Sequence, residues 1–162
     1  MNRENIERCG KLLAGKGMTI AFAESATAGR LAMEFSLCKD SGKFLKGGLV
    51  CYDACLKEDV LHVSQEVIDA YSPESAEVTF AIAAGLEQLI KADLHIGITG
   101  LTSAGGSESA EKPVGTMFFC GLFGENKVFE DRKVFSGSPE DIILAAVDHT
   151  AKQLCDFLQS SN

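Results

Sequence analysis

The stretch "SPESAEVTFAIAAGLEQLIKADLHIGITG", residues 72–100, decides the fold because it joins a long apolar helix to a buried strand. Residues 72–92 show the clearest helical pattern in the chain. We expect Ser72 to be the N-cap of this helix and Pro73 to lie in its first turn. Residues 93–100 form an apolar run of strand length that opens into a glycine-rich loop. A helix followed by such a strand and loop is typical of α/β proteins.

Outward from this stretch, strand-like runs alternate with helical segments. Further strands are predicted at 18–23, 47–52, 114–123 and 127–135, and further helices at 4–17, 27–38, 56–63, 64–71 and 138–158. The last two strands are joined by "GEN" and form a β-hairpin. Strands between helices, with one late hairpin, predict a single three-layer α/β/α domain over residues 1–162 with a mixed sheet.

The composition is that of an ordinary globular protein, with 46% apolar and 23% charged residues. The formal charge of −8 repels phosphate backbones, which argues against nucleic acid as a partner. Residues 1–10 lack the apolar core of a signal peptide, and the apolar stretch 113–124 is too short to cross a membrane. We therefore expect a soluble, cytoplasmic protein without a membrane partner.

Cysteines and histidines show no pattern typical of a metal site. The six cysteines sit mostly in apolar runs and include no C-x-x-C pair, which indicates buried, reduced thiols. His62, His95 and His149 are scattered along the chain without the spacing of metal ligands. We expect neither a metal nor another cofactor.

Three junctions between strands and helices carry polar side chains, at residues 24–30, 52–57 and 99–106. In open α/β sheets, ligands gather where strands end and loops lead into helices. The sequence therefore predicts that a small-molecule site lies at these junctions.

Ser25 follows a predicted strand, and two roles are open to it. As a capping residue, Ser25 or Thr27 would accept a hydrogen bond from the first turn of the next helix. As a nucleophile, Ser25 would attack a carbonyl while N–H groups of Ala26, Thr27 or Ala28 stabilise the oxyanion. The G-x-S-x-G pattern of many hydrolases is absent, so the local sequence favours the capping role.

A nucleophilic serine needs a base, and Lys57 is the candidate. A lysine that is partly desolvated can lose its proton near neutral pH and activate a serine. The alternative is a solvated surface lysine beside Glu58 and Asp59. Tyr52 can orient Lys57 or donate a hydrogen bond to a developing charge, or it belongs to the core with its hydroxyl at the rim.

The loop at 99–106 combines glycines with hydroxyl groups, as a nest around a phosphate or ribose does. It is neither a G-x-G-x-x-G nor a Walker A loop, which argues against nucleoside triphosphate chemistry. A flexible connector is the alternative. Lys112, further along, either reaches an anionic ligand or faces water.

Together, these junctions resemble the family of the C-terminal domain of the competence/damage-inducible protein CinA, whose stand-alone members include nicotinamide mononucleotide amidohydrolases. "AESATAG" (23–29) resembles A-E-S-C-T-G-G, and "GGLVCYDACLK" (47–57) resembles G-G-x-V-x-Y-S-N-E-A-K. "ITGLTSAGGSESAEKPVGT" (98–116) resembles V-T-G-I-A-G-P-G-G-G-x-x-E-K-P-V-G-T. Order and spacing agree over nearly the whole chain, apart from about one extra residue before Glu111.

The resemblance implies amide hydrolysis by a serine–lysine mechanism, with the family tyrosine at Tyr52. Ser25 would attack the carboxamide carbon of the nicotinamide ring and Lys57 would take its proton. Ammonia would leave, and water would release nicotinic acid mononucleotide from an acyl-enzyme without a metal. The resemblance also implies a homo-oligomer. The substrate-binding residues that it implies are Glu24, Ala26, Thr27, Gly29, Thr99, Gly100, Gly105 and Gly106.

The sequence departs from the family pattern around these positions. Ala26 and Ala28 stand where the family has a cysteine and a glycine, and a methyl group at Ala28 could crowd the approach of a backbone. "DACL" (53–56) and "TSAG" (102–105) also replace family segments. These changes suggest a divergent member.

The final helix has Pro139 and Ile143 where the family has two arginines. A charged hydrogen bond from arginine to phosphate contributes about 1.5–3 kcal/mol, so binding of a nucleotide monophosphate should weaken. Two alternatives therefore stay open beside hydrolysis of nicotinamide mononucleotide. One is a non-catalytic domain that binds a small ligand or partner, and the other is a serine–lysine amidase on an amide without a phosphate.

Overall fold

A single mixed sheet forms the centre of the computed structural model, in which residues 3–160 are described. Its strands are β1 (Ile20–Glu24), β2 (Leu45–Val50), β3 (Leu94–Gly100), β4 (Thr116–Phe123) and β5 (Asn126–Val134). They lie side by side in the order β2-β1-β3-β4-β5. β1 is parallel to β2 and β3, whereas β3–β4 and β4–β5 are antiparallel pairs. The sheet is therefore mixed, and its antiparallel side ends in the predicted hairpin.

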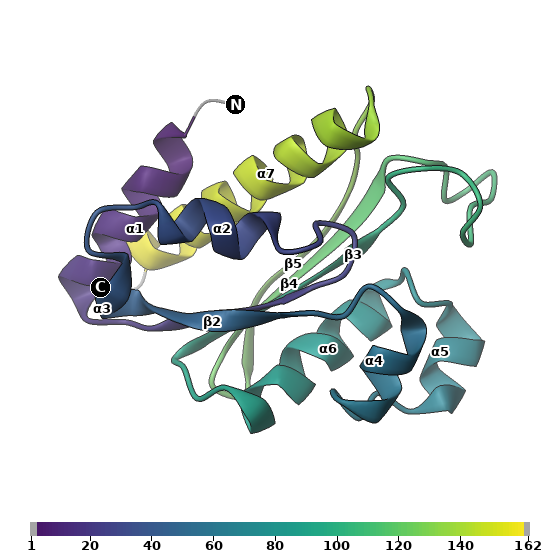
Figure 1. Cartoon of the computed structure of the whole chain (residues 1–162), viewed down its shortest axis with the longest axis horizontal. Helices are drawn as coiled ribbons and strands as arrows, with labels where there is room; N and C mark the ends of the chain where they lie inside the picture. Colours follow the sequence, from purple (N-terminus) through teal and green to yellow (C-terminus); the bar gives the residue numbers. More distant parts are fainter. Residues whose placement is uncertain (1–2, 161–162) are drawn as a thin grey trace.

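Helices cover both faces of this sheet (Figure 1). They are α1 (Glu4–Lys16), α2 (Arg30–Ser36), α3 (Ser41–Phe44), α4 (Ala54–Asp59), α5 (Gln65–Tyr71), α6 (Ala76–Leu89) and α7 (Pro139–Ser160). In Figure 1, α1, α2, α3 and α7 lie on one face, and α4, α5 and α6 lie on the other. The predicted three-layer α/β/α fold is confirmed.

The core is divided by the sheet into two layers of apolar side chains. The larger layer lies under α1, α2 and α7 and includes Phe22, Phe35 and Leu154. The second lies under α6 and includes Ile82 and Leu86. Because both faces are covered, every residue of β1 is buried, and so is all of β3 except its last residue. This explains the continuous apolar runs in the sequence.

Two helices begin later than predicted. The N-cap of α6 is Ser75, whose hydroxyl accepts a hydrogen bond from the Val78 N–H at 3.2 Å, and not Ser72. Ser72 has φ 71° and ψ 157°, so the chain bends there and Pro73 lies before the helix. The helix predicted over 27–38 begins only at Arg30, after a turn. Both late starts leave short polar segments outside the helices, residues 25–29 after β1 and residues 72–75 after α5.

At Gly97, α6 packs closely against β3. A Cβ atom at Gly97 would lie 2.3 Å from the Thr79 carbonyl oxygen, whereas one at Gly15 in α1 would meet no atom within 4 Å. We expect Gly97→Ala to destabilise the protein by about 1–3 kcal/mol through overpacking. Gly15→Ala should stabilise it by about 0.5–1 kcal/mol through helix propensity. Urea unfolding of both variants checks these opposite signs, and equal effects would contradict this packing.

Candidate active site

Ser25 lies in a turn directly after β1 and before α2. Its N–H donates to the Ile98 carbonyl of β3 at 3.0 Å, and its own carbonyl accepts from the Ala28 N–H at 3.1 Å. The residue is 6% exposed, and its hydroxyl has no hydrogen-bonding partner within residues 3–160. The Ala26 and Thr27 N–H groups also donate no hydrogen bond within this range, whereas that of Ala28 is already used. The backbone thus fixes Ser25 and leaves its hydroxyl available.

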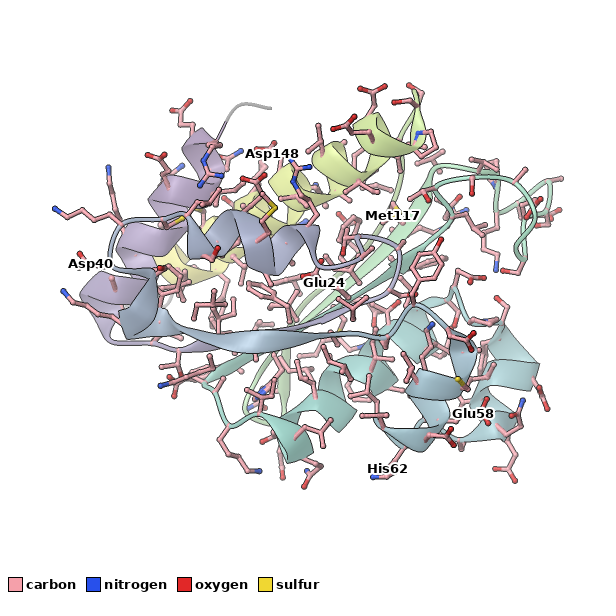
Figure 2. All side chains as sticks on the ribbon, viewed as in Figure 1. Glu24, Asp40, Glu58, His62, Met117 and Asp148 are labelled. Atoms are coloured by element: carbon pink, nitrogen blue, oxygen red, sulfur yellow. The ribbon has the colours of Figure 1, made fainter. Side chains whose placement is uncertain are left out.

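Glu24, and neither Ser25 nor Thr27, caps α2. The Glu24 carboxylate accepts hydrogen bonds from the N–H groups of Leu31 at 2.9 Å and Ala32 at 2.8 Å. It also accepts from the Gly29 N–H at 3.1 Å and the Thr27 hydroxyl at 2.6 Å. Figure 2 shows Glu24 beside the start of α2. The capping role that the local sequence favoured for Ser25 or Thr27 is wrong, because the helix starts too late for either residue to serve it.

Ala28 adopts a left-handed conformation in this turn, with φ 50°. Such a conformation costs an L-residue about 1–2 kcal/mol and suits glycine, the residue of the family pattern at this place. The alanine side chain is exposed, so its methyl group does not crowd the chain. Alanine in place of the family glycine therefore strains the backbone at residue 28 but does not change the course of the turn.

Lys57 projects from α4 into the interior and is only 1% exposed. Its Nζ donates to the Cys51 carbonyl at 2.9 Å and to the Tyr52 carbonyl at 3.4 Å. The Cys51 N–H in turn donates to the Glu24 carbonyl at 2.8 Å, one residue before Ser25. The structure thus brings Lys57 to the junction that holds Ser25, and the solvated surface lysine is excluded. No hydrogen bond joins the two side chains in the described part of the chain.

Cys51 places a second nucleophilic side chain in this junction. Burial raises the pKa of its thiol to about 11, although the Lys57 charge opposes this shift. The thiol is therefore protonated at neutral pH and is not a competing nucleophile. The prediction of buried cysteines holds for five of the six, since Cys55 is exposed.

A cavity of about 230 Å³ lies where β1, β2 and β3 end. Its lining includes Ser25 and Ala26 from the first junction and Tyr52 from the second. The rest is formed by Glu74 and by the loop from Gly100 to Gly106. Tyr52 is 63% exposed and stands at the rim, not in the core. The three polar junctions predicted from the sequence therefore meet around one cavity.

Several residues implied as substrate-binding stand behind this lining. Thr27 and Gly29 hold the Glu24 carboxylate, as described above. The Thr99 hydroxyl is bonded to the Thr79 hydroxyl at 2.7 Å and is fully buried. Only Ala26, Gly100, Gly105 and Gly106 of that set line the cavity, so direct contact of the others with a substrate stays a prediction.

Glu74 is the lining residue that sequence reasoning missed. The sequence predicts a helix over residues 72–92, which includes Glu74, yet this residue lies in the bend before α6. Its carboxylate accepts a hydrogen bond from the Ser107 hydroxyl of the glycine-rich loop. Had the late start of α6 been recognised from Ser75, Glu74 would have fallen in a loop at the sheet edge, where ligand-binding residues gather.

Lys112 links the glycine-rich loop to the bend before α6 by hydrogen bonds. Its Nζ donates to the hydroxyls of Ser72 and Ser107, each at 2.6 Å, and to the Glu74 carbonyl at 2.9 Å. Desolvation lowers the pKa of Lys112, and the Glu74 charge opposes this shift. All three N–H groups of the ammonium are engaged. Lys112 therefore supports the loop, and neither of the two roles open to it in the sequence applies.

The positions of the two family arginines lie in the first turns of α7. Pro139 opens the helix, and Ile143 packs against the larger core layer. Neither residue offers a charge. The cavity lining contains no lysine or arginine in the described part of the chain, and Glu74 is its one charged residue.

Within residues 3–160, no group of three or more histidine, cysteine, aspartate or glutamate side chains is arranged to hold a metal ion. No helix in this range has both the length and the apolar character that crossing a bilayer requires.

The fold and site define an α/β protein with a small polar cavity, a free serine hydroxyl and a buried lysine at the ends of parallel strands. The chain belongs to the CinA C-terminal domain family, whose model matches residues 2–158. It is 31% identical over 152 residues to nicotinamide-nucleotide amidohydrolase PncC from Enterobacter agglomerans, covering 93% of this chain and 92% of that one. A CinA-like protein from Mycolicibacterium gilvum is 38% identical over 131 residues, or 81% of this chain. The chain spans about a third of the length of that relative and of several others.

Solved structures of this superfamily have the same fold. A CinA superfamily protein from Klebsiella pneumoniae superposes with a TM-score of 0.93 at 28% identity, covering 99% of both chains. One from Escherichia coli superposes with a TM-score of 0.86 at 28% identity, covering 95% of this chain and 91% of that one. The likeness extends over the sheet and the helices on both of its faces.

Proposed function

We propose that the chain is an amidohydrolase that uses Ser25 and Lys57 to hydrolyse the carboxamide of nicotinamide mononucleotide, giving nicotinic acid mononucleotide and ammonia. The observation that carries the proposal is the unbonded Ser25 hydroxyl, which lines the cavity at the junction that also holds the buried Lys57. The relative named nicotinamide-nucleotide amidohydrolase supports the choice of substrate.

The reaction has two steps in this mechanism. Ser25 Oγ attacks the carboxamide carbon, and its proton passes to Lys57 Nζ and then to the leaving nitrogen, which departs as ammonia. Water then attacks the acyl-enzyme ester, its proton passes to Ser25 Oγ through Lys57, and the carboxylic acid is released. The free N–H groups of Ala26 and Thr27 are the candidate donors to the oxyanion in both steps.

No hydrogen bond joins Lys57 to Ser25 within residues 3–160, so proton transfer requires a movement of the lysine side chain or one bridging water. Catalytic hydrogen bonds are often long in the free enzyme and tighten when substrate is bound. Its longer bond, 3.4 Å to the Tyr52 carbonyl, is the weaker one and the easier to exchange. Tyr52 lines the cavity beside this carbonyl, which suits a role in orienting the substrate at the rim.

Ammonia release tests the proposal directly. We expect the purified protein to release one ammonia per nicotinamide mononucleotide converted, without an added metal, as followed by a coupled ammonia assay and by chromatography of the product. A folded protein that releases no ammonia from this nucleotide or from its phosphate-free analogue would refute the amidohydrolase function.

A second candidate is hydrolysis of an amide that lacks a phosphate. The observation in its favour is the lining itself, which includes Glu74 and no cationic side chain within residues 3–160. A nucleotide monophosphate would meet no counter-charge there. Comparison of nicotinamide mononucleotide with nicotinamide riboside, the same molecule without its phosphate, separates the two candidates. A third candidate, a non-catalytic binding domain, would show binding without ammonia release.

A further inference from the structure

The glycine-rich loop binds a carboxylate of its own, the side chain of Glu108. The Glu108 carboxylate accepts a hydrogen bond from the Gly105 N–H through Oε1 and one from the Gly106 N–H through Oε2, each at 2.8 Å. Gly105 has φ 101°, a left-handed conformation that lets successive N–H groups converge on one anion. Both glycines line the cavity that Ser25 faces.

The Glu108 carboxylate is charged at neutral pH. The hydrogen bond from the Gly105 N–H, with that from Gly106, holds the pKa of this carboxyl below its usual range. The two N–H groups are thus occupied by a negative group on a neighbouring residue of the same loop. An external phosphate that binds them has to displace this group.

Within residues 3–160, no positively charged side chain lines the cavity to attract that phosphate. Lys112, which follows in the same loop, directs its ammonium to Ser72, Glu74 and Ser107. Glu74, which lines the cavity, is a second carboxylate near this loop, where it accepts a hydrogen bond from the Ser107 hydroxyl. The two positions of the family arginines hold a proline and an isoleucine. A phosphate at the two N–H groups would therefore approach two carboxylates, and like charges brought close together repel one another.

We propose that Glu108 is a specificity-determining residue that fills the anion position of the loop and makes the cavity select carboxamides without a phosphate. The favoured substrate class is a pyridinium nucleoside amide, whose ring carries a positive charge that suits Glu74. This inference rests on the proposed serine–lysine hydrolysis for its reaction and favours the second candidate, an amide without a phosphate, as the substrate. The occupation of the loop by Glu108 stands independently of it.

The test compares the parent protein with Glu108→Gln, which keeps the size of the side chain and removes its charge. Inorganic phosphate is titrated while the amide signals of Gly105 and Gly106 are followed by NMR. We expect phosphate to bind Glu108→Gln at least about tenfold more tightly, with the largest shifts at these two amides. The ratio of kcat/KM for nicotinamide mononucleotide over nicotinamide riboside should rise at least about tenfold as well.

Glu125→Gln is the matched control, because it makes the same change of charge in the β4–β5 turn. β3 and β4 pair from Leu94 opposite Phe123 to Gly100 opposite Met117, so this turn lies at the end of the sheet away from the cavity. Equal phosphate affinity in the parent, Glu108→Gln and Glu125→Gln would overturn the proposal. If neither nicotinamide mononucleotide nor nicotinamide riboside is hydrolysed, the proposed function fails. The phosphate titration still decides the role of Glu108.

Discussion

Ser25→Ala should lower the rate of ammonia release by at least roughly 1000-fold while the protein stays folded, because it removes the proposed nucleophile. The Ser25 hydroxyl makes no hydrogen bond within residues 3–160, so its removal leaves no partner unsatisfied. The backbone N–H of residue 25 still donates its hydrogen bond to the Ile98 carbonyl when alanine replaces serine, so the turn stays fixed. Steady-state ammonia assays, with thermal unfolding to verify the fold, measure both effects.

Ser136→Ala is the control for this experiment, since Ser136 is an exposed serine between β5 and α7. It should retain the parent rate. If Ser25→Ala also keeps that rate, Ser25 is not the nucleophile and the proposed mechanism fails.

Lys57→Met should lower kcat by about 10²–10⁴-fold, since it keeps a long apolar side chain and removes the proton acceptor. The Cys51 and Tyr52 carbonyls lose their donor, so we also expect a loss of about 1–3 kcal/mol in the free energy of unfolding. Activity has to be measured below the lowered melting temperature. Lys57→Arg restores a donor to the carbonyls but provides no neutral base, so it should recover stability better than activity.

Lys46→Met provides the matched control because Lys46 is an exposed lysine of β2. It should change neither stability nor kcat appreciably. A Lys57→Met protein with parent kcat would contradict the role of Lys57 as the base, whatever its stability.

Much of the fold could be predicted because its signals are local and agree with one another. The apolar runs of β1 and β3 follow from helices on both faces of the sheet, and the hairpin follows from a short turn between two strands. The errors lie at helix starts. Both Ser72 and Ser75 are acceptable N-caps by type, and the choice depends on the positive φ of Ser72, which residue type does not reveal. The four-residue helix α3 carries too few residues to show a period.

The location of the site could be predicted from the sequence, but the hydrogen bonds of its side chains could be predicted less well. Three strand ends carry polar residues, and a parallel arrangement brings them together, which is why Ser25, Tyr52 and Gly105 share one cavity. Glu24 shows where this reasoning stops. The resemblance to the family implies a ligand contact for Glu24, yet its carboxylate accepts hydrogen bonds from the backbone of α2, because the turn places it there. Likewise, nothing in the order of residues shows that Glu108 reaches back to two glycine N–H groups.

The central claim is that Ser25 becomes covalently acylated during turnover, and mass spectrometry after rapid acid quench measures this most directly. With nicotinamide riboside or its mononucleotide as substrate, we predict an acyl adduct on the peptide that contains Ser25. It should form no more slowly than ammonia is released and should be missing in Ser25→Ala. An adduct on another residue, or turnover by Ser25→Ala at the parent rate, would contradict the claim.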